Sequence, residues 1–316
     1  MNMKHSAPFI HTEMNDSYIS IVHLISLIPV MSVAVVYYGV RAAILILFCA
    51  GVFAASDDIC TRVRDHRHDS YLSSLFYGSA FALLLPPDTP LYIALAGVLF
   101  GSIVIRQLSG GRGSALINPA AAARLFIRIV FPDNECALSF PGQSRTYIRS
   151  LLIGSRGIAG FDINDYYPSE LITGRYPSFL GTACAFMMLA GLIYLIAKKA
   201  YKFYIPLSYI AMTVMLSLIA DEYLDTSNTQ MFLLTSGVLF TSAYLLSDDE
   251  TVRQYGVVSI VQAFFCAVLT VLVSMKTSGI DVIVVPVVVT GVMTGVFDYA
   301  ERVIRSTWEE KLHVKP

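Results

Sequence analysis

Hydrophobic runs separated by short polar stretches dominate this chain of 316 residues. Ten of the runs are each about 17–23 residues long, which is the length that a helix needs to cross roughly 30 Å of hydrocarbon. They centre on residues 20–39, 41–57, 72–87, 90–106, 117–132, 176–198, 203–220, 230–247, 255–274 and 281–297. The pattern predicts an all-α polytopic membrane protein with about ten transmembrane helices.

Small and polar landmarks recur in the same order in the two halves of the chain. In each half a glycine precedes an apolar run that ends in a polar turn, and a second glycine turn and a proline follow after one more span. The landmarks are Gly78, Pro86–Asp88, Ser109–Gly111 and Asn118-Pro119 in the first half, and Gly237, Ser247–Asp249, Thr277–Gly279 and Pro286 in the second. Five spans per half is an odd number, so the halves would have opposite orientations. The order therefore predicts a 5+5 inverted repeat, which places a site between the halves near the middle of the membrane.

The composition supports a membrane protein and excludes several other classes. Hydrophobic residues make up 55% of the chain and charged residues 14%, with a mean hydropathy of +0.63, whereas a soluble domain carries roughly a quarter charged residues. The net charge of −1 gives no footprint for nucleic acid. Phosphate-binding loops, nucleophile motifs and metal-ligand spacings are missing, so the sequence predicts neither a catalytic residue nor a metal ligand.

Lysines and arginines are unevenly distributed between the two sides of the membrane. An even number of spans puts both termini on one side, where the loops and tails hold 14 of these residues against 6 on the other side. Because such residues accumulate in cytoplasmic loops, both termini are expected in the cytoplasm, for a multi-pass protein of the inner (plasma) membrane. The expected units are a tail over 1–17, a first repeat over 18–132, a long external loop over 133–175, a second repeat over 176–299 and a tail over 300–316.

A glycine-rich turn interrupts the hydrophobic pattern between the fourth and fifth spans. Gly110, Gly111 and Gly113 let the backbone approach a ligand closely and adopt dihedral angles that other residues avoid. Asn118 followed by Pro119 is typical of a helix start, with the asparagine as N-cap. A helix N-terminus presents N–H groups and partial positive charge to an anion, so this segment is a candidate binding site.

Five motifs, in the same order along the chain, resemble those of the D subunit of Rnf complexes and the B subunit of the sodium-pumping NADH:quinone reductase. They are Ser109–Gly113 with Ile117–Ala120, Leu84–Pro87, Lys198-Lys199 with Tyr204–Leu207, Leu246–Asp248, and Phe297–Tyr299. The resemblance covers roughly residues 18–305. It implies a urea-transporter-like fold of ten helices. It also implies an electron-transfer subunit that works only with other membrane subunits of an Rnf- or Nqr-like complex, in a lipid bilayer, and couples electron flow to Na+ or H+ movement.

The resemblance also implies a flavin cofactor, FMN or riboflavin. The family attaches FMN to the threonine of an S-G-A-T motif in the long external loop, and this chain lacks that motif. The nearest position is Thr146, where Ser144 and Arg145 replace the glycine and alanine. We therefore expect most molecules to carry no flavin on Thr146. The candidate contacts to a flavin held without a covalent bond are Gly110, Gly111, Gly113, Asn118 and Arg124.

Two arginines within the fifth span also call for a partner. Arg124 and Arg128 are four residues apart and share one helix face. Two cations at membrane depth do not face lipid, so a flavin phosphate, a carboxylate of a partner subunit or the external headgroups would neutralise them. Arg128 lies near the outer end, where its side chain can reach the headgroups, whereas Arg124 is the candidate for a ligand or cavity.

Two further functions remain open on the same fold. One is a stand-alone transporter or channel for a small polar solute or for flavin, and the other is a flavin-free structural subunit of an electron-transport complex. A flavin spectrum that dithionite bleaches would favour the electron-transfer subunit, whereas solute flux in liposomes would favour the transporter.

Overall fold

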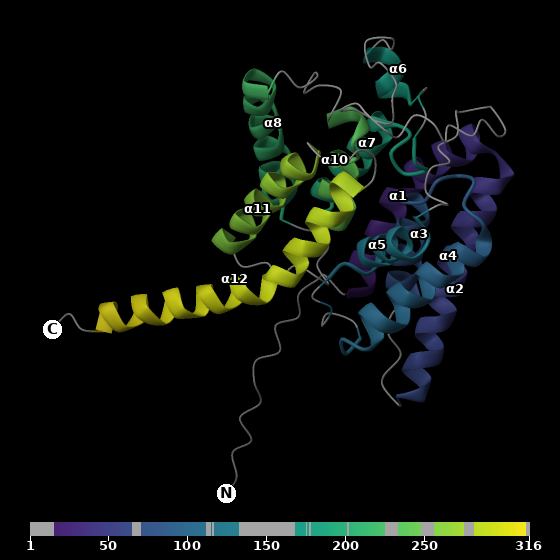
Figure 1. The fold of residues 1–316 in the computed structure, drawn as a ribbon. Helices are drawn as coiled ribbons and strands as arrows, with labels where there is room; N and C mark the ends of the chain where they lie inside the picture. Colours follow the sequence, from purple (N-terminus) through teal and green to yellow (C-terminus); the bar gives the residue numbers. More distant parts are fainter. Residues whose placement is uncertain are drawn as a thin grey trace, which may run out of the picture.

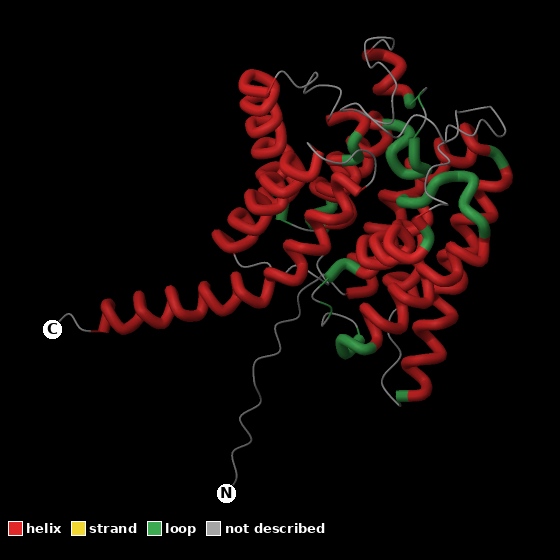
Figure 2. The backbone as a smooth tube through the Cα atoms, viewed as in Figure 1, coloured by secondary structure: helices red, strands yellow, loops and turns green. Residues whose placement is uncertain are grey.

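A computed structural model describes residues 16–64, 71–111, 115, 117–132, 168–174, 176, 178–200, 202–224, 233–247, 256–274 and 281–313. Every regular element in these ranges is helical, as Figures 1 and 2 show. The first half contains α1 (Asp16–Tyr38), α2 (Val40–Val63), α3 (Tyr71–Leu83), α4 (Leu91–Leu99), the π-helical segment η1 (Phe100–Gln107) and α5 (Pro119–Val130). The second half contains α6 (Pro168–Thr173), α7 (Ala185–Ala197), α8 (Tyr204–Leu224), α10 (Val238–Phe240), the π-helical segment η4 (Thr241–Leu245), α11 (Gly256–Ser274) and α12 (Asp281–His313).

The expected spans and the observed helices differ most at three places. Helix α2 continues to Val63, past the expected end at 57. The expected span 176–198 is helical only from Ala185 onwards, and the expected span 230–247 is divided at Gly237 into short α- and π-helical pieces. Apolar composition marks burial in protein as well as in lipid, so it does not distinguish a helix from packed irregular backbone. The predicted C-terminal tail is helical as far as His313, because α12 continues beyond the apolar part.

The helices of each half pack closely on one another. Helix α3 packs against α2 and α1, while α8 and α12 both pack against α11. A Cβ atom at Gly78 would lie 2.7 Å from the Ala50 Cα and from the Cys49 carbonyl oxygen, so α3 crosses α2 at a point where only glycine fits. The two halves meet where α1 packs against α7 and where α5 packs against α12. The second of these contacts brings α5, the helix after the glycine turn, next to the last described helix.

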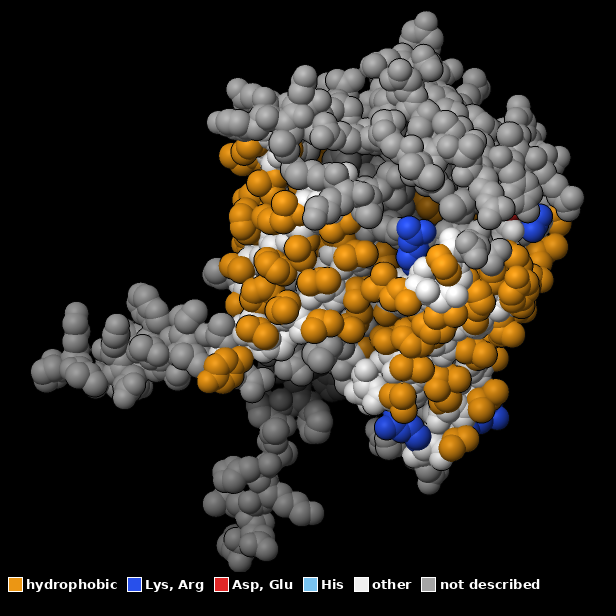
Figure 3. Space-filling model, in the orientation of Figure 1, with side chains coloured by type: hydrophobic (Ala, Val, Ile, Leu, Met, Phe, Trp, Pro, Cys, Tyr) orange, Lys and Arg blue, Asp and Glu red, His pale blue; other side chains and the backbone are white. Residues whose placement is uncertain are grey.

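The outer surface of the helical body is apolar. Hydrophobic side chains cover most of the described face in Figure 3, with few charges among them. Exposed apolar side chains occur along α2, α7, α8 and α12, including Leu47, Ile193, Leu207 and Val296. Two described helices, Ser17–Tyr38 and Val40–Val63, are long and apolar enough by length and composition to cross a membrane. Five shorter apolar helices accompany them, at Leu91–Gln107, Ala185–Ala197, Tyr204–Ala220, Val258–Ser274 and Val282–Phe297.

Candidate functional site

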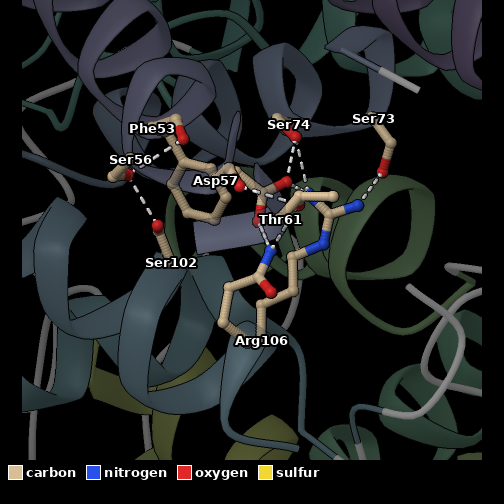
Figure 4. Close-up of polar contacts among 9 residues, drawn as sticks. Phe53, Ser56, Asp57, Thr61, Ser73, Ser74, Ser102 and Arg106 are labelled. Carbon is tan, nitrogen blue, oxygen red and sulfur yellow. Dashed lines mark hydrogen bonds and ion pairs between the residues drawn. The ribbon is translucent and has the colours of Figure 1, made fainter. Parts of the chain in front are cut away.

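A buried ion pair lies in the first half of the molecule, between α2 and η1 (Figure 4). The Arg106 Nη1 atom lies 2.7 Å from Asp57 Oδ2, and the two residues are 0% and 2% exposed. Asp57 is the only carboxylate among the residues whose side chains the structure describes as buried. Charges removed from water are costly unless they are paired and hydrogen-bonded, so this pair must hold its geometry closely.

Hydroxyl and amide groups surround the ion pair. Arg106 donates to the hydroxyls of Ser73 and Ser74 at 2.8 Å each, and both serines come from α3. Asp57 in turn accepts hydrogen bonds from the Ser74 hydroxyl and from the Gln107 side-chain amide. Together these contacts join α2, α3 and η1 through one neutral polar cluster, which we call the Asp57–Arg106 cluster.

The glycine turn begins directly after this cluster and closes the end of η1. The Gly111 N–H donates to the Arg106 carbonyl oxygen at 3.1 Å, and the Gly110 N–H donates to the Gln107 carbonyl oxygen at 3.2 Å. The φ angles are +117° at Gly110 and +91° at Gly111, which residues with a side chain rarely adopt. The glycines therefore have the unusual backbone that the sequence predicted, and their N–H groups are bonded within the chain.

Asn118 starts α5 as the sequence predicted. Its Oδ1 atom accepts hydrogen bonds from the N–H groups of Ala120 at 3.0 Å and Ala121 at 3.3 Å, and its carbonyl oxygen accepts one from Ala122 at 3.0 Å. The Asn118 Nδ2 atom donates to the carbonyl oxygen of Leu245 in η4 at 3.2 Å. One side chain thus caps α5 and links it to the second half of the chain. The first N–H groups of α5, which the sequence assigned to an anion, are used by this cap.

The arginines of α5 differ in their surroundings, as the sequence led us to expect. Arg124 is 1% exposed, and its guanidinium carbon lies 5.5 Å from the centroid of the Phe179 ring. Such a position over an aromatic face is favourable for a cation in an apolar environment. Arg128 is only partly buried.

Arg106 requires a correction to the charge distribution derived from the sequence. That distribution placed Arg106 in a solvated loop, whereas the side chain is fully buried in η1. The sequence analysis also missed Asp57, Ser73 and Ser74, because they stand at the ends of apolar runs where polar residues are expected to meet water. The signal that could have identified the pair was an acidic residue at the end of the apolar run 41–57 and a basic residue at the end of the run 90–106.

Two candidate residues lie outside the described residues, namely Gly113 in the glycine turn and Thr146 in the long loop. Among the residues that the structure does describe, no three histidines, cysteines or acidic residues gather in a possible metal site. The described candidates belong to the end of η1 and to α5. Gly110 and Gly111 follow the end of η1, Asn118 precedes the first residue of α5, and Arg124 lies further along α5 beside Phe179.

The described residues form a helical body with an apolar exterior, interior charges and broken helices inside it, which is the architecture of an integral membrane protein. The chain belongs to the NQR2, RnfD, RnfE family, whose model matches residues 3–305.

Curated relatives agree with this assignment. The chain is 24% identical over 288 residues to the D subunit of the ion-translocating oxidoreductase complex of Escherichia fergusonii, with 78% of this chain and 81% of that protein covered. The proteins of the same name from Escherichia coli K12 and from Escherichia coli O9:H4 show the same 24% identity over 288 residues, with the same coverage of both chains.

Proposed function

We propose that this chain is a membrane subunit of an ion-translocating electron-transport complex of the Rnf type. The observation that carries the proposal is the family match over residues 3–305, because the match extends over both halves of the chain. The relatives are named as D subunits of a complex, so the partners proposed for this chain are other membrane subunits. Within such a complex the chain would conduct electrons and help couple their flow to the movement of Na+ or H+.

We propose for the same chain a 5+5 inverted repeat with both termini in the cytoplasm of the inner membrane. The order of landmarks in the two halves supports the repeat, although the halves differ in detail. Gly78 lies within the continuous helix α3, whereas Gly237 has a φ of +79° and precedes α10. Moving Arg106 from the loops to the interior leaves 13 positive residues (14 − 1) against 6, so the charge asymmetry still supports this orientation.

The proposed cofactor is a flavin, FMN or riboflavin, and the described residues fit it only in part. The N–H groups of Gly110 and Gly111, and those at the start of α5, are bonded within the chain. These glycines would therefore contribute room for close approach rather than hydrogen-bond donors. The buried guanidinium of Arg124 fits better, since a fixed cation in an apolar interior suits a flavin phosphate.

The part of the chain in the redox step would be to bind and shield the cofactor. A bound flavin supplies the electron chemistry itself, so the protein needs to orient it and exclude water. Arg124 would hold the phosphate, and the buried residues on either side of α5 would keep the site dry. The Asp57–Arg106 cluster would fix the position of the glycine turn by fixing η1.

An absorption spectrum of the purified protein tests the flavin proposal. We expect a flavin spectrum that dithionite bleaches. Acid precipitation should release the flavin into the supernatant, because the attachment motif is missing around Thr146. Flavin that stays with the precipitate and disappears in Thr146→Val would contradict the absence of a covalent bond.

A flavin-free structural subunit is the second candidate function. The observation that favours it is the internal bonding of the amides in the glycine turn, which then needs no ligand. The same spectrum separates the two candidates, because a colourless protein that still assembles with its partners would support the structural subunit.

A further inference from the structure

A basic turn joins α7 to α8 in the second half of the chain. It contains Lys198, Lys199 and Lys202, and all three are exposed. Residues 176–220 contain these three lysines and no aspartate or glutamate, so this stretch of the sequence carries positive charge only. The proposed function of the chain does not use this turn.

Lys199 has a backbone conformation that glycine normally provides. Its φ is +53°, and it is the only residue other than glycine with a positive φ in the described ranges. The Lys199 N–H donates to the Ile196 carbonyl oxygen at 3.0 Å, and the Ala200 N–H donates to the Leu195 carbonyl oxygen at 3.1 Å. This is the bonding pattern that closes a helix with a left-handed residue, and glycine adopts it without steric conflict. Turn geometry therefore does not explain a lysine at this position, and its ammonium group needs another explanation.

The surroundings of the turn indicate the edge of the bilayer. Ile193 on α7 is 65% exposed and Leu207 on α8 is 59% exposed, so both helices present apolar side chains close to the turn. Phe203 is 59% exposed and follows Lys202, whose Nζ atom lies 5.9 Å from the centroid of the Tyr204 ring. Aromatic rings beside lysines are typical of the boundary between acyl chains and headgroups.

We propose that this turn binds the headgroup of an anionic phospholipid. The phosphate would lie among the ammonium groups of Lys198, Lys199 and Lys202, while the acyl chains would lie along Ile193 and Leu207. A soluble phosphate would make only the first set of contacts, so the exposed apolar residues on both sides favour a lipid. The preference of the turn for anionic over zwitterionic lipid should weaken as salt concentration rises, since these lysines are in contact with solvent.

Native mass spectrometry of the full chain in mild detergent tests the proposal with phosphatidylglycerol, cardiolipin and phosphatidylcholine as probes. The wild type should retain the two anionic lipids in preference to phosphatidylcholine. The triple variant with Lys198, Lys199 and Lys202 each changed to Gln should lose that preference, by about fivefold for each lysine removed. Equal retention of all three lipids by the wild type, or an unchanged preference in the triple variant, would overturn the proposal.

Lys199→Gly separates lipid binding from a role of the charge in the fold. Glycine relieves the left-handed strain, so this variant should fold and unfold at a higher temperature than the wild type in detergent, while retaining less anionic lipid. If the lysine served only to stabilise the C-terminal end of α7, lipid retention would stay unchanged.

The matched control is Arg62→Gln. Arg62 is also exposed and basic, but it is paired with Asp58 at 2.8 Å. This variant should retain anionic lipid as the wild type does. If it lost as much anionic lipid as Lys199→Gly, the overall charge of the protein would explain the loss, which would contradict a binding site at the turn.

Discussion

At the scale of single residues, Asp57 and Arg106 are the described residues whose charges depend most on each other. Each is buried among apolar helices, and each has the other as its ion-pair partner. The two charges balance, so the cluster is neutral as a whole, and the surrounding hydroxyl and amide groups add hydrogen bonds to both side chains. A cluster of this kind contributes to the specificity of packing, because an arrangement of α2, α3 and η1 that separated these groups would leave them buried without partners.

Asp57→Asn should destabilise the protein by about 3 kcal/mol or more, because it leaves the Arg106 charge buried without a counter-charge. Denaturant unfolding in mixed micelles measures this loss. Adding Arg106→Gln to the first change removes the second charge as well, so the double variant should recover part of the loss.

The control for this pair is Arg41→Gln. It breaks an ion pair of 3.0 Å between Arg41 and Asp88, whose side chains are 51% and 23% exposed, so its cost should stay below about 1 kcal/mol. A double variant less stable than Asp57→Asn would contradict a dependence of each charge on the other.

The glycine turn leads to a second prediction at the same scale. Gly111 has a φ of +91°, so Gly111→Ala should cost about 1 kcal/mol or more. Gly51→Ala should instead be neutral or stabilising by up to about 1 kcal/mol, since Gly51 lies within α2 with no atom near the position of an added Cβ.

A larger side chain at the same turn tests the proposed site. Gly111→Leu should insert into the membrane normally but lose bound flavin and assembly with partner subunits. Wild-type flavin content and assembly in Gly111→Leu would show that the turn is a connector only.

At the scale of helices, the sequence predicted the start of α5 well and the limits of other helices less well. Asn118 and Pro119 identify a helix start through local chemistry, and α5 begins there. The segment before Ala185 is as apolar as a helix but is irregular, because it packs against the first half of the chain through backbone bonds such as that from Gly181 to the Leu83 carbonyl oxygen at 2.6 Å. Contacts of this kind join residues about a hundred positions apart, and no local pattern encodes them.

In the candidate site, too, the sequence predicted the features that depend on neighbouring residues and missed those that depend on contacts between distant residues. The positive φ angles of Gly110 and Gly111 were predictable from residue type alone. The Asp57–Arg106 cluster was not, because its members come from three helices and meet only when these pack. The hydrogen bond from Asn118 to the Leu245 carbonyl oxygen could not be predicted from the local sequence either, because its two residues are 127 positions apart.

Variants of Asn118 test how α5 depends on its N-cap and on the hydrogen bond to the Leu245 carbonyl oxygen. Asn118→Ala removes the cap and the bond to η4, so it should cost about 2 kcal/mol, at the upper end for a lost cap. Asn118→Ser keeps an oxygen for the cap but loses the donor to Leu245. Its stability in detergent should therefore lie between that of the wild type and that of Asn118→Ala. Equal stability of the serine variant and the wild type would show that the bond to η4 contributes little.

At the scale of the whole molecule, the two halves are joined where α1 packs against α7 and where α5 packs against α12, and the apolar exterior indicates that both halves lie in the membrane. The proposed orientation puts residues 133–175 outside the cell. A Ser155→Cys variant, in a chain whose five native cysteines are replaced by serine, should react with an impermeant thiol reagent in intact cells. Labelling only after lysis would reverse the orientation.

The central claim is that this chain functions inside a multi-subunit ion-translocating complex. The most direct measurement is isolation of the tagged chain from native membranes in mild detergent, followed by native electrophoresis and mass spectrometry of the isolated species. We predict that the chain migrates in one large complex with other subunits of an ion-translocating oxidoreductase. Migration of the chain alone, as a monomer or as an assembly of identical copies, would contradict the claim.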